Sequence, residues 1–166
     1  GTFVTNQNKR FRPADFASWQ SGEYVIEATT KDKFGNTIKD VRYFTVYSSS
    51  DNAPATHTEL SIDLLHETDK SFTPKSSFEP GETAYIKIGS SHKDALVLYE
   101  VELENKIISR EWIKLNNNYK TFSIPITVDH RKGLGVHAVL FKNGKGTNLD
   151  IPIYVPRESK QLDVTY

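Results

Sequence analysis

The sequence predicts an all-β protein, a seven-stranded antiparallel sandwich preceded by a partial β module. Apolar side chains recur at every second position through most of the chain, and no stretch of 12 or more residues carries the i, i+3, i+4, i+7 spacing of a helix with one buried side. After a polar stretch near residue 50, seven strand-like runs follow within about 100 residues, separated by turn residues. Short alternating runs at this density are typical of a sandwich.

The N-terminal region predicts one β-hairpin. Residues 23–31 and 41–47 each alternate apolar and polar side chains, and the Lys-Phe-Gly-Asn sequence at 33–36 supplies a turn between them. Trp19 is expected to cover one end of this small sheet. Because few strands precede the hairpin, we expect residues 1–48 to be a partial β module.

A polar segment, residues 49–56, follows the hairpin. It is small and polar with one proline, so it offers little to a core, and we expect an interdomain linker. The sandwich is then expected over residues 57–158. Residues 161–166 repeat the alternation of residues 59–64, so we expect residues 159–166 to be the first strand of a following module or a C-terminal tail.

The first five runs of the sandwich show the clearest inward faces. Four of these faces are expected to carry Leu60, Ile62 and Leu64; Ala84, Ile86 and Ile88; Ala95, Val97, Tyr99, Val101 and Leu103; and Phe122, Ile124, Ile126 and Val128. Leu96 and Leu98 add apolar surface to the other side of residues 95–103, which predicts a central strand. Pro125 lacks a backbone donor and predicts an edge strand.

Turns connect the runs. The sequence FEPGET at 78–83 predicts a turn that feeds the second run, after a long polar connection over residues 68–77. Glu104-Asn105-Lys106 predicts a hairpin into residues 107–115. The glycine-containing residues 142–146 join the last two runs, residues 136–141 and 149–155.

Composition excludes several classes of function. The 21 basic and 21 acidic residues balance without any run of one sign, so no nucleic acid partner is expected. The chain has no Cys, which excludes a disulfide, a thiolate metal site and a thiol nucleophile. No apolar run approaches the roughly 20 residues of a membrane helix, so no membrane contact is expected from this chain. A start at Gly1 instead of Met indicates a piece of a longer protein.

We assign no catalytic, cofactor-binding or metal-binding residue from the sequence, and we expect no enzyme and no cofactor. Ser90-Ser91-His92-Lys93-Asp94 contains the residue types of a nucleophile relay, but sequence neighbours rarely converge on one reacting atom, so a polar loop is expected. Asp129 and His130 are expected to lie in a turn. His57, His66 and His137 lack a metal-ligand spacing, so any metal site would have to be assembled by the fold.

Carboxylates and aromatic residues offer two further possibilities. Glu100, Glu102 and Glu104 recur at every second position, as a glycosidase pair could, but a solvated face is the simpler expectation. The two Trp and eight Tyr could form a platform on which sugars stack, although aromatic residues are also common in sandwich cores. We expect Tyr99 and Phe122 in the core, and Trp112 in the core or in a contact between modules.

Several sequence motifs, in this order, resemble those of a known family. FEPGETAYIKI at 78–88, ALVLYEVE at 95–102 and FSIPIT at 122–127 resemble macroglobulin-type domains of bacterial α2-macroglobulin-like proteins of the Bacteroides kind. WQSGEYVIEA at 19–28 and DKFGN at 32–36 resemble the closing strands of a preceding module in the same proteins. The resemblance implies that residues 57–158 form an immunoglobulin-like macroglobulin sandwich.

The resemblance also implies a function. Proteins of this family are multi-domain protease traps of the cell envelope, and the chain would be a non-catalytic structural and interaction module of such an endopeptidase inhibitor. Its partners would be neighbouring modules of the same polypeptide and, in the whole protein, a target protease. The parent would be periplasmic, or anchored to the outer membrane, or extracellular.

The covalent trapping of the family does not carry over to this sequence, and the sequence does not assign a bait segment. Covalent trapping needs a thioester Cys, which the chain lacks, and no long unstructured insertion marks a bait segment. Residues 48–56 are the most cleavable stretch, but a linker explains them better. The alternative function is an adhesin or glycan-binding accessory module of a surface protein, which the aromatic residues would permit.

Overall fold

The computed structural model describes residues 15–68 and 72–157, and the chain divides into two compact units between Tyr47 and Ser48. Among the described residues, no helix has the length and apolar character needed to cross a membrane. The segment 159–166, expected as a further strand or tail, lies outside the described residues.

The first unit is a hairpin, as predicted. A short 3₁₀ helix, η1 (Phe16–Ser18), precedes β1 (Gly22–Lys31) and β2 (Thr37–Val46), which pair antiparallel along their full length. The Asp32 carboxylate accepts hydrogen bonds from the backbone N–H groups of Phe34 and Asn36, at 2.8 and 2.9 Å, and so closes the turn.

Aromatic rings cover one face of this hairpin near its open end. The Trp19 ring stacks on Tyr24, with ring centres 4.8 Å apart, and Tyr24 in turn stacks beside Phe44 of the facing strand. This arrangement confirms the expected place of Trp19. The cluster is small because a two-stranded sheet has no second layer to pack against.

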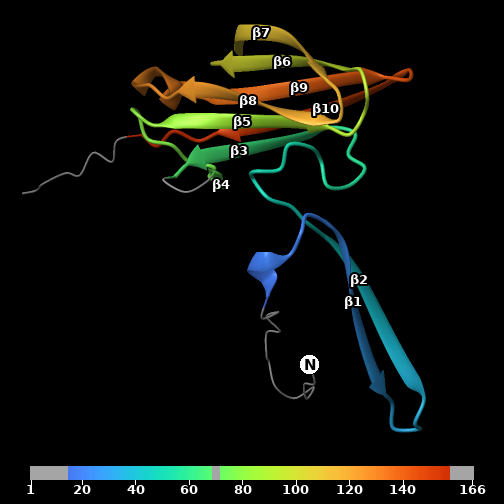
Figure 1. Cartoon of the computed structure of the whole chain (residues 1–166). Coiled ribbons are helices and arrows are strands. Elements are labelled where there is room, and N and C mark those ends of the chain that lie inside the picture. Colours follow the sequence, from blue (N-terminus) through green and yellow to red (C-terminus); the bar gives the residue numbers. More distant parts are fainter. Residues whose placement is uncertain (1–14, 69–71, 158–166) are drawn as a thin grey trace, which may run out of the picture. The chain divides into compact units, whose positions relative to one another are not determined.

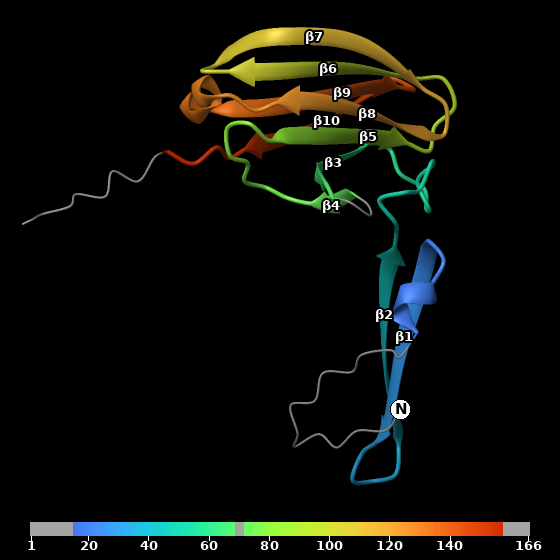
Figure 2. The same cartoon turned by 60° about the vertical axis from the view of Figure 1, so that its left-hand side comes forward.

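The second unit is an antiparallel sandwich, which confirms the predicted fold class. Its elements (Figure 1) are β3 (Ser61–Glu67), β4 (Phe72–Pro74), β5 (Thr83–Ser90), β6 (Ala95–Leu103), β7 (Lys106–Leu115), β8 (Asn118–Pro125), η2 (Val128–Lys132), β9 (Leu134–Lys142) and β10 (Lys145–Ile153). They form two four-stranded sheets, with strand orders β10-β9-β6-β7 and β4-β3-β5-β8. In Figure 2 the sheet that contains β6 and β7 lies above the sheet that contains β3 and β5.

In the described part of the chain the sandwich has eight strands, where the sequence predicted seven. The additional strand, β4, is short and falls within the connection that we expected to be long and polar. It pairs with the end of β3, from Leu65 opposite Pro74 to Glu67 opposite Phe72. The Phe72 ring meets Tyr85 edge-on at 5.0 Å, and this contact favours an extended backbone that a polar composition did not predict.

The core lies between the two sheets and follows the predicted alternation. Its buried residues are Leu60, Leu64, Phe78, Ala84, Ile86, Ile88, Ala95, Val97, Tyr99, Val101, Ile113, Leu115, Ile126, Leu134, Val136, Ala138, Leu140, Ile153 and Val155. Tyr99 stacks on the partly buried Phe122 across the two sheets at 4.5 Å, which confirms both as core residues. Val128 was expected to continue this face but is 61% exposed, because the chain leaves the sheet after Ile126 and enters η2.

The strand positions and turns also agree with the sequence. β6 lies between β7 and β9, and β8 pairs with β5 alone, as Pro125 predicted. Glu104 and Asn105 take positive φ angles in the β6–β7 turn, and Asn143 does so in the β9–β10 turn.

The turn before β5 is tight. Glu82 donates its N–H to the Glu79 carbonyl at 3.0 Å, and Gly81 has a φ of 99°, which an L side chain rarely adopts. The Glu82 carboxylate accepts hydrogen bonds from the Glu79 N–H and from Lys75 Nζ, at 2.7 and 2.6 Å. These contacts explain the acidic residues of the turn as structural.

The segment between residues 48 and 60 lies against β5 and β8 within the second unit. Lys87 Nζ donates to the carbonyls of Ser49 and Asp51, at 2.6 and 2.9 Å, and the Tyr119 N–H donates to the Asn52 carbonyl at 3.1 Å. The stretch that we expected to be a linker is therefore hydrogen-bonded to the sandwich.

Candidate functional site

The outward surface of β7, β6 and β9 carries a continuous set of apolar side chains. In the strand register Leu98 lies opposite both Trp112 and Val139, and Leu96 lies opposite Phe141. Side chains of directly paired residues share a face, so these five residues form one surface, which we call the outer apolar face. Leu96, Trp112 and Phe141 are 47%, 54% and 58% exposed.

The local sequence explains why these side chains point outward. Val97, Ile113 and Leu140, the neighbours of the exposed residues, are buried in the core, and successive side chains of a strand point to opposite faces. Of the two places that we expected for Trp112, the core is therefore wrong, and a contact between modules stays a prediction. Contiguous exposed apolar surface of this kind marks interaction sites more often than scattered single residues do.

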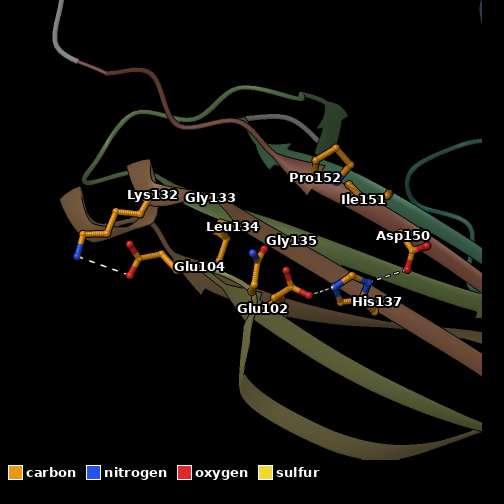
Figure 3. A pocket seen from close by; sticks show the side chains of 11 residues that line it. Glu102, Glu104, Lys132, Gly133, Leu134, Gly135, His137, Asp150, Ile151 and Pro152 are labelled. Atoms are coloured by element: carbon orange, nitrogen blue, oxygen red, sulfur yellow. Dashed lines mark hydrogen bonds and ion pairs between the residues drawn. The ribbon is translucent and has the colours of Figure 1, made fainter.

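A row of charged residues crosses the same sheet face beside the outer apolar face. His137 of β9 lies opposite Glu100 of β6 and Asp150 of β10 in the register, and Glu100 lies opposite Arg110 of β7. Arg110 Nε donates to the Glu100 carboxylate. His137 Nδ1 is 2.6 Å from Asp150 Oδ1 and its Nε2 is 3.0 Å from Glu102 Oε2 (Figure 3).

The imidazole of His137 is suited to carry a positive charge. Hydrogen bonds to Asp150 and Glu102 raise the pKa of His137 above its ordinary value, although partial burial opposes them. Both ring nitrogens face a carboxylate oxygen, and only the imidazolium can donate from both at once.

The charged row borders a shallow hollow of about 310 Å³. Glu102, Glu104, Lys132, His137 and Asp150 contribute its charged lining, and Figure 3 shows these side chains around it. Lys132 Nζ lies 3.8 Å from the Glu104 carboxylate. Each of the three glutamates at 100, 102 and 104 therefore faces a basic group, and they do not form a facing pair as in a glycosidase.

The Ser90–Asp94 segment lies between β5 and β6, as expected of a polar loop, and the fold adds residues to it that the sequence did not connect. His57 and Glu59 lie beside His92, although 33 or more residues separate them from it in the chain. Ser91 Oγ donates to the Thr58 carbonyl at 2.9 Å, so its proton is not directed at His57 and the hydroxyl is not activated as a nucleophile.

The remaining histidines lie apart. Asp129 and His130, which we expected in a turn, lie in the short 3₁₀ helix η2, where His130 Nδ1 accepts a hydrogen bond from the Thr127 N–H at 3.1 Å. Burial lowers the pKa of His130. His66 of β3 places its ring near Phe78, with centres 6.3 Å apart. Neither joins the cluster around His92.

The fold defines an all-β sandwich module with an exposed apolar surface on one sheet. The family model of the alpha-2-macroglobulin bait region domain matches residues 71–166, which is more than half of the chain. No curated protein matches the chain. The chain belongs to the alpha-2-macroglobulin bait region domain family, and the match includes the residues of β4 to β10.

Proposed function

We propose that this chain is a non-catalytic structural and interaction module of a bacterial α2-macroglobulin-like endopeptidase inhibitor. The inhibitor would be a protease trap of the cell envelope, in the periplasm or exposed outside the cell, of the Bacteroides kind. The observation that carries the proposal is the family match over residues 71–166, and the outer apolar face supports it.

The outer apolar face has the make-up of a docking surface. Its centre is aromatic and aliphatic, and one side is bordered by the charged row of Arg110, Glu100, His137 and Asp150. An apolar centre with a polar rim is the usual anatomy of a protein interface. Neighbouring modules of the same polypeptide are the partners we propose for it.

The hairpin of the first unit also supports contacts with further polypeptide. Apolar side chains emerge from both of its faces: Tyr24 and Phe44 lie on one, and Val25 and Tyr43 on the other. Tyr43 is 81% exposed. A two-stranded sheet is at best marginally stable in water, so this hairpin needs a covering surface. We infer that it belongs to a macroglobulin-like module that further polypeptide completes.

The whole parent protein tests the proposal. A trap that encloses a protease leaves the active site intact, so the protease should keep its activity on a small peptide substrate and lose it on a large protein substrate. We expect this pattern for the parent, and we expect the parent gene to encode a tandem series of similar modules. Equal activity on both substrates, or a parent without such a series, would overturn the proposal.

Exposed Trp112 favours one other function, glycan binding. An indole ring beside carboxylates and a guanidinium is a surface on which a sugar can stack and form hydrogen bonds. A glycan array separates the two functions. Sugar-dependent binding that Trp112→Ala abolishes, with the fold intact, would favour a glycan-binding module over a contact between protein modules.

A further inference from the structure

His57, Glu59 and His92 form a compact cluster on the second unit, away from the outer apolar face. One ligand atom from each residue can be chosen such that all three lie within 4.8 Å of one another. His92 Nε2 is 2.6 Å from one Glu59 carboxylate oxygen, and His57 Nε2 is 3.4 Å from the other. The two imidazole rings meet edge-on, with centres 5.6 Å apart.

Hydrogen bonds of the surrounding backbone hold the two segments of the cluster together. The Ser91 N–H donates to the Thr58 carbonyl and the Thr58 N–H donates to Ser91 Oγ, both at 2.9 Å. Ser90 Oγ donates to the Glu59 carbonyl at 2.6 Å, and the Asn117 N–H donates to the His92 carbonyl at 2.9 Å. The backbones that carry the three side chains are therefore fixed before any ligand binds.

The hydroxyl of Ser91 determines which nitrogen of His57 carries a proton. This hydroxyl donates its own proton to the Thr58 carbonyl, so at 3.4 Å from His57 Nδ1 it can only accept. The His57 tautomer that fits this contact carries its proton on Nδ1, and its Nε2, 3.4 Å from the Glu59 carboxylate, then offers a lone pair. A lone pair opposite a carboxylate oxygen is unfavourable unless a cation, either a proton or a metal ion, lies between them.

We propose that His57, Glu59 and His92 bind a divalent transition-metal ion of the Zn²⁺ type. Two imidazole nitrogens and one carboxylate are the donor set that zinc accepts in sites with three protein ligands, where water completes the tetrahedron. The hydrogen bond from His57 Nδ1 to Ser91 Oγ is the outer contact that orients a metal-binding imidazole. His57 and Glu59 are exposed at the surface, so their side chains can rotate toward a common centre.

The proposed site also carries the negative charge that a cation requires. The Glu59 carboxylate supplies it, because its two oxygens face His92 Nε2 and His57 Nε2. A bound ion would connect the segment before β3 to the β5–β6 turn, which are 33 residues apart at Glu59 and His92. Because the unfolded chain cannot offer this geometry, metal binding should stabilise the second unit.

Isothermal titration of the untagged chain with Zn²⁺ at neutral pH tests the proposal. We expect saturable binding of one ion per chain. His57→Ala, His92→Ala and Glu59→Gln should each weaken the affinity by about tenfold or more, since loss of even an outer contact costs about that much at known sites. The matched control is His130→Gln. It removes a histidine of η2, beyond the end of β8, and should leave the affinity for Zn²⁺ unchanged.

Chemical shifts of the backbone amides provide a second measurement that does not depend on any variant. Addition of Zn²⁺ should shift the amides of residues 57–60 and 90–93 before others. The absence of saturable binding up to about 1 mM Zn²⁺ would overturn the proposal, because a dissociation constant of that size corresponds to a binding free energy of only about 4 kcal/mol. Shifts confined to other segments, or wild-type affinity in both His57→Ala and His92→Ala, would overturn it as well.

Discussion

The ammonium group of Lys87 lies 4.2 Å from the centre of the Tyr119 ring, in a lysine that is only 6% exposed. Burial lowers the pKa of Lys87, and the nearby carboxylates of Asp51 and Asp63 oppose that shift. Burial likewise raises the pKa of Asp63, against the effect of Lys87. The ammonium therefore depends on the ring and on the Ser49 and Asp51 carbonyls to compensate for lost hydration.

Replacement of Lys87 with Met should destabilise the second unit. The substitution leaves two carbonyls without their donor, and we expect the free energy of unfolding to fall by about 2–3 kcal/mol. Urea unfolding measures this loss, and limited proteolysis should show faster cleavage within residues 48–56. Lys120→Met, at an exposed position of β8, is the control and should change the stability by less than about 0.5 kcal/mol. Equal urea midpoints for Lys87→Met and Lys120→Met would contradict a stabilising role of Lys87.

Gly89 lies directly under the same tyrosine ring. A Cβ atom at Gly89 would be 2.2 Å from two ring carbons of Tyr119, which is far inside van der Waals contact. Gly89→Ala should therefore cost about 1–3 kcal/mol of stability, because the ring must leave its place above the strand. Gly146→Ala is the control, since its Cβ would meet Phe141 at an ordinary 3.5 Å.

A double substitution checks the cause of the Gly89 effect. In a Tyr119→Ala background the ring is absent, so Gly89→Ala should cost much less than it does in the natural chain. An additive double mutant would show that the glycine is required for another reason. Thermal or urea unfolding of the unsubstituted chain, the two single variants and the double variant gives the four stabilities of this double-mutant cycle.

His137 should stabilise the sandwich in a pH-dependent way. Its folded-state pKa is raised, so its stabilising contribution is complete below the unfolded value of about 6.5 and is lost as the pH rises through the folded value. His137→Gln should cost about 0.5–1 kcal/mol at pH 5.5 and close to nothing at pH 9, measured by urea unfolding. Asp150→Asn should remove most of the same dependence, because its hydrogen bond is the largest cause of the shift. A loss that is equal at both pH values would contradict this account.

Trp112→Ala should separate stability from association. The side chain is more than half exposed, so we expect the free energy of unfolding to change by less than about 1 kcal/mol. If the outer apolar face contacts a neighbouring module, binding of that module should weaken by about tenfold or more, as for a central aromatic residue of an interface. Val128→Ala is the matched control, because Val128 is also more than half exposed but lies on η2. Titration calorimetry with the adjacent module of the parent measures the affinity of both variants. Equal affinities of Trp112→Ala and Val128→Ala would exclude Trp112 from the interface.

Much of the fold could be predicted from alternation alone. Ala84, Ile86 and Ile88 are all fully buried, and Pro125 indeed lies on an edge strand, because the two-residue period of a strand and the missing donor of proline are local properties. Val128 and β4 were missed for a different reason. The exit of the chain into η2 and the contact of Phe72 with Tyr85 depend on neighbours that are distant in sequence.

The candidate sites were less predictable than the strands. Trp112 lies on the opposite side of its strand from Ile113, as alternation requires, but alternation does not say whether that side is covered. The spacing of His57 and Glu59 was visible in the sequence, but their proximity to His92 follows from the hydrogen bonds between Thr58 and Ser91. A single sequence does not specify that pairing.

A parallel bridge between Ser77 and Tyr154 joins the β4–β5 connection to the chain that follows β10. Phe78 donates its N–H to the Tyr154 carbonyl at 2.9 Å, and Tyr154 donates to the Ser76 carbonyl at 3.2 Å. Tyr154 directly follows Ile153, the last residue of β10. In mechanical terms, a force transmitted toward the sandwich through Val155 would act on this pair before it reaches the ladder between β9 and β10.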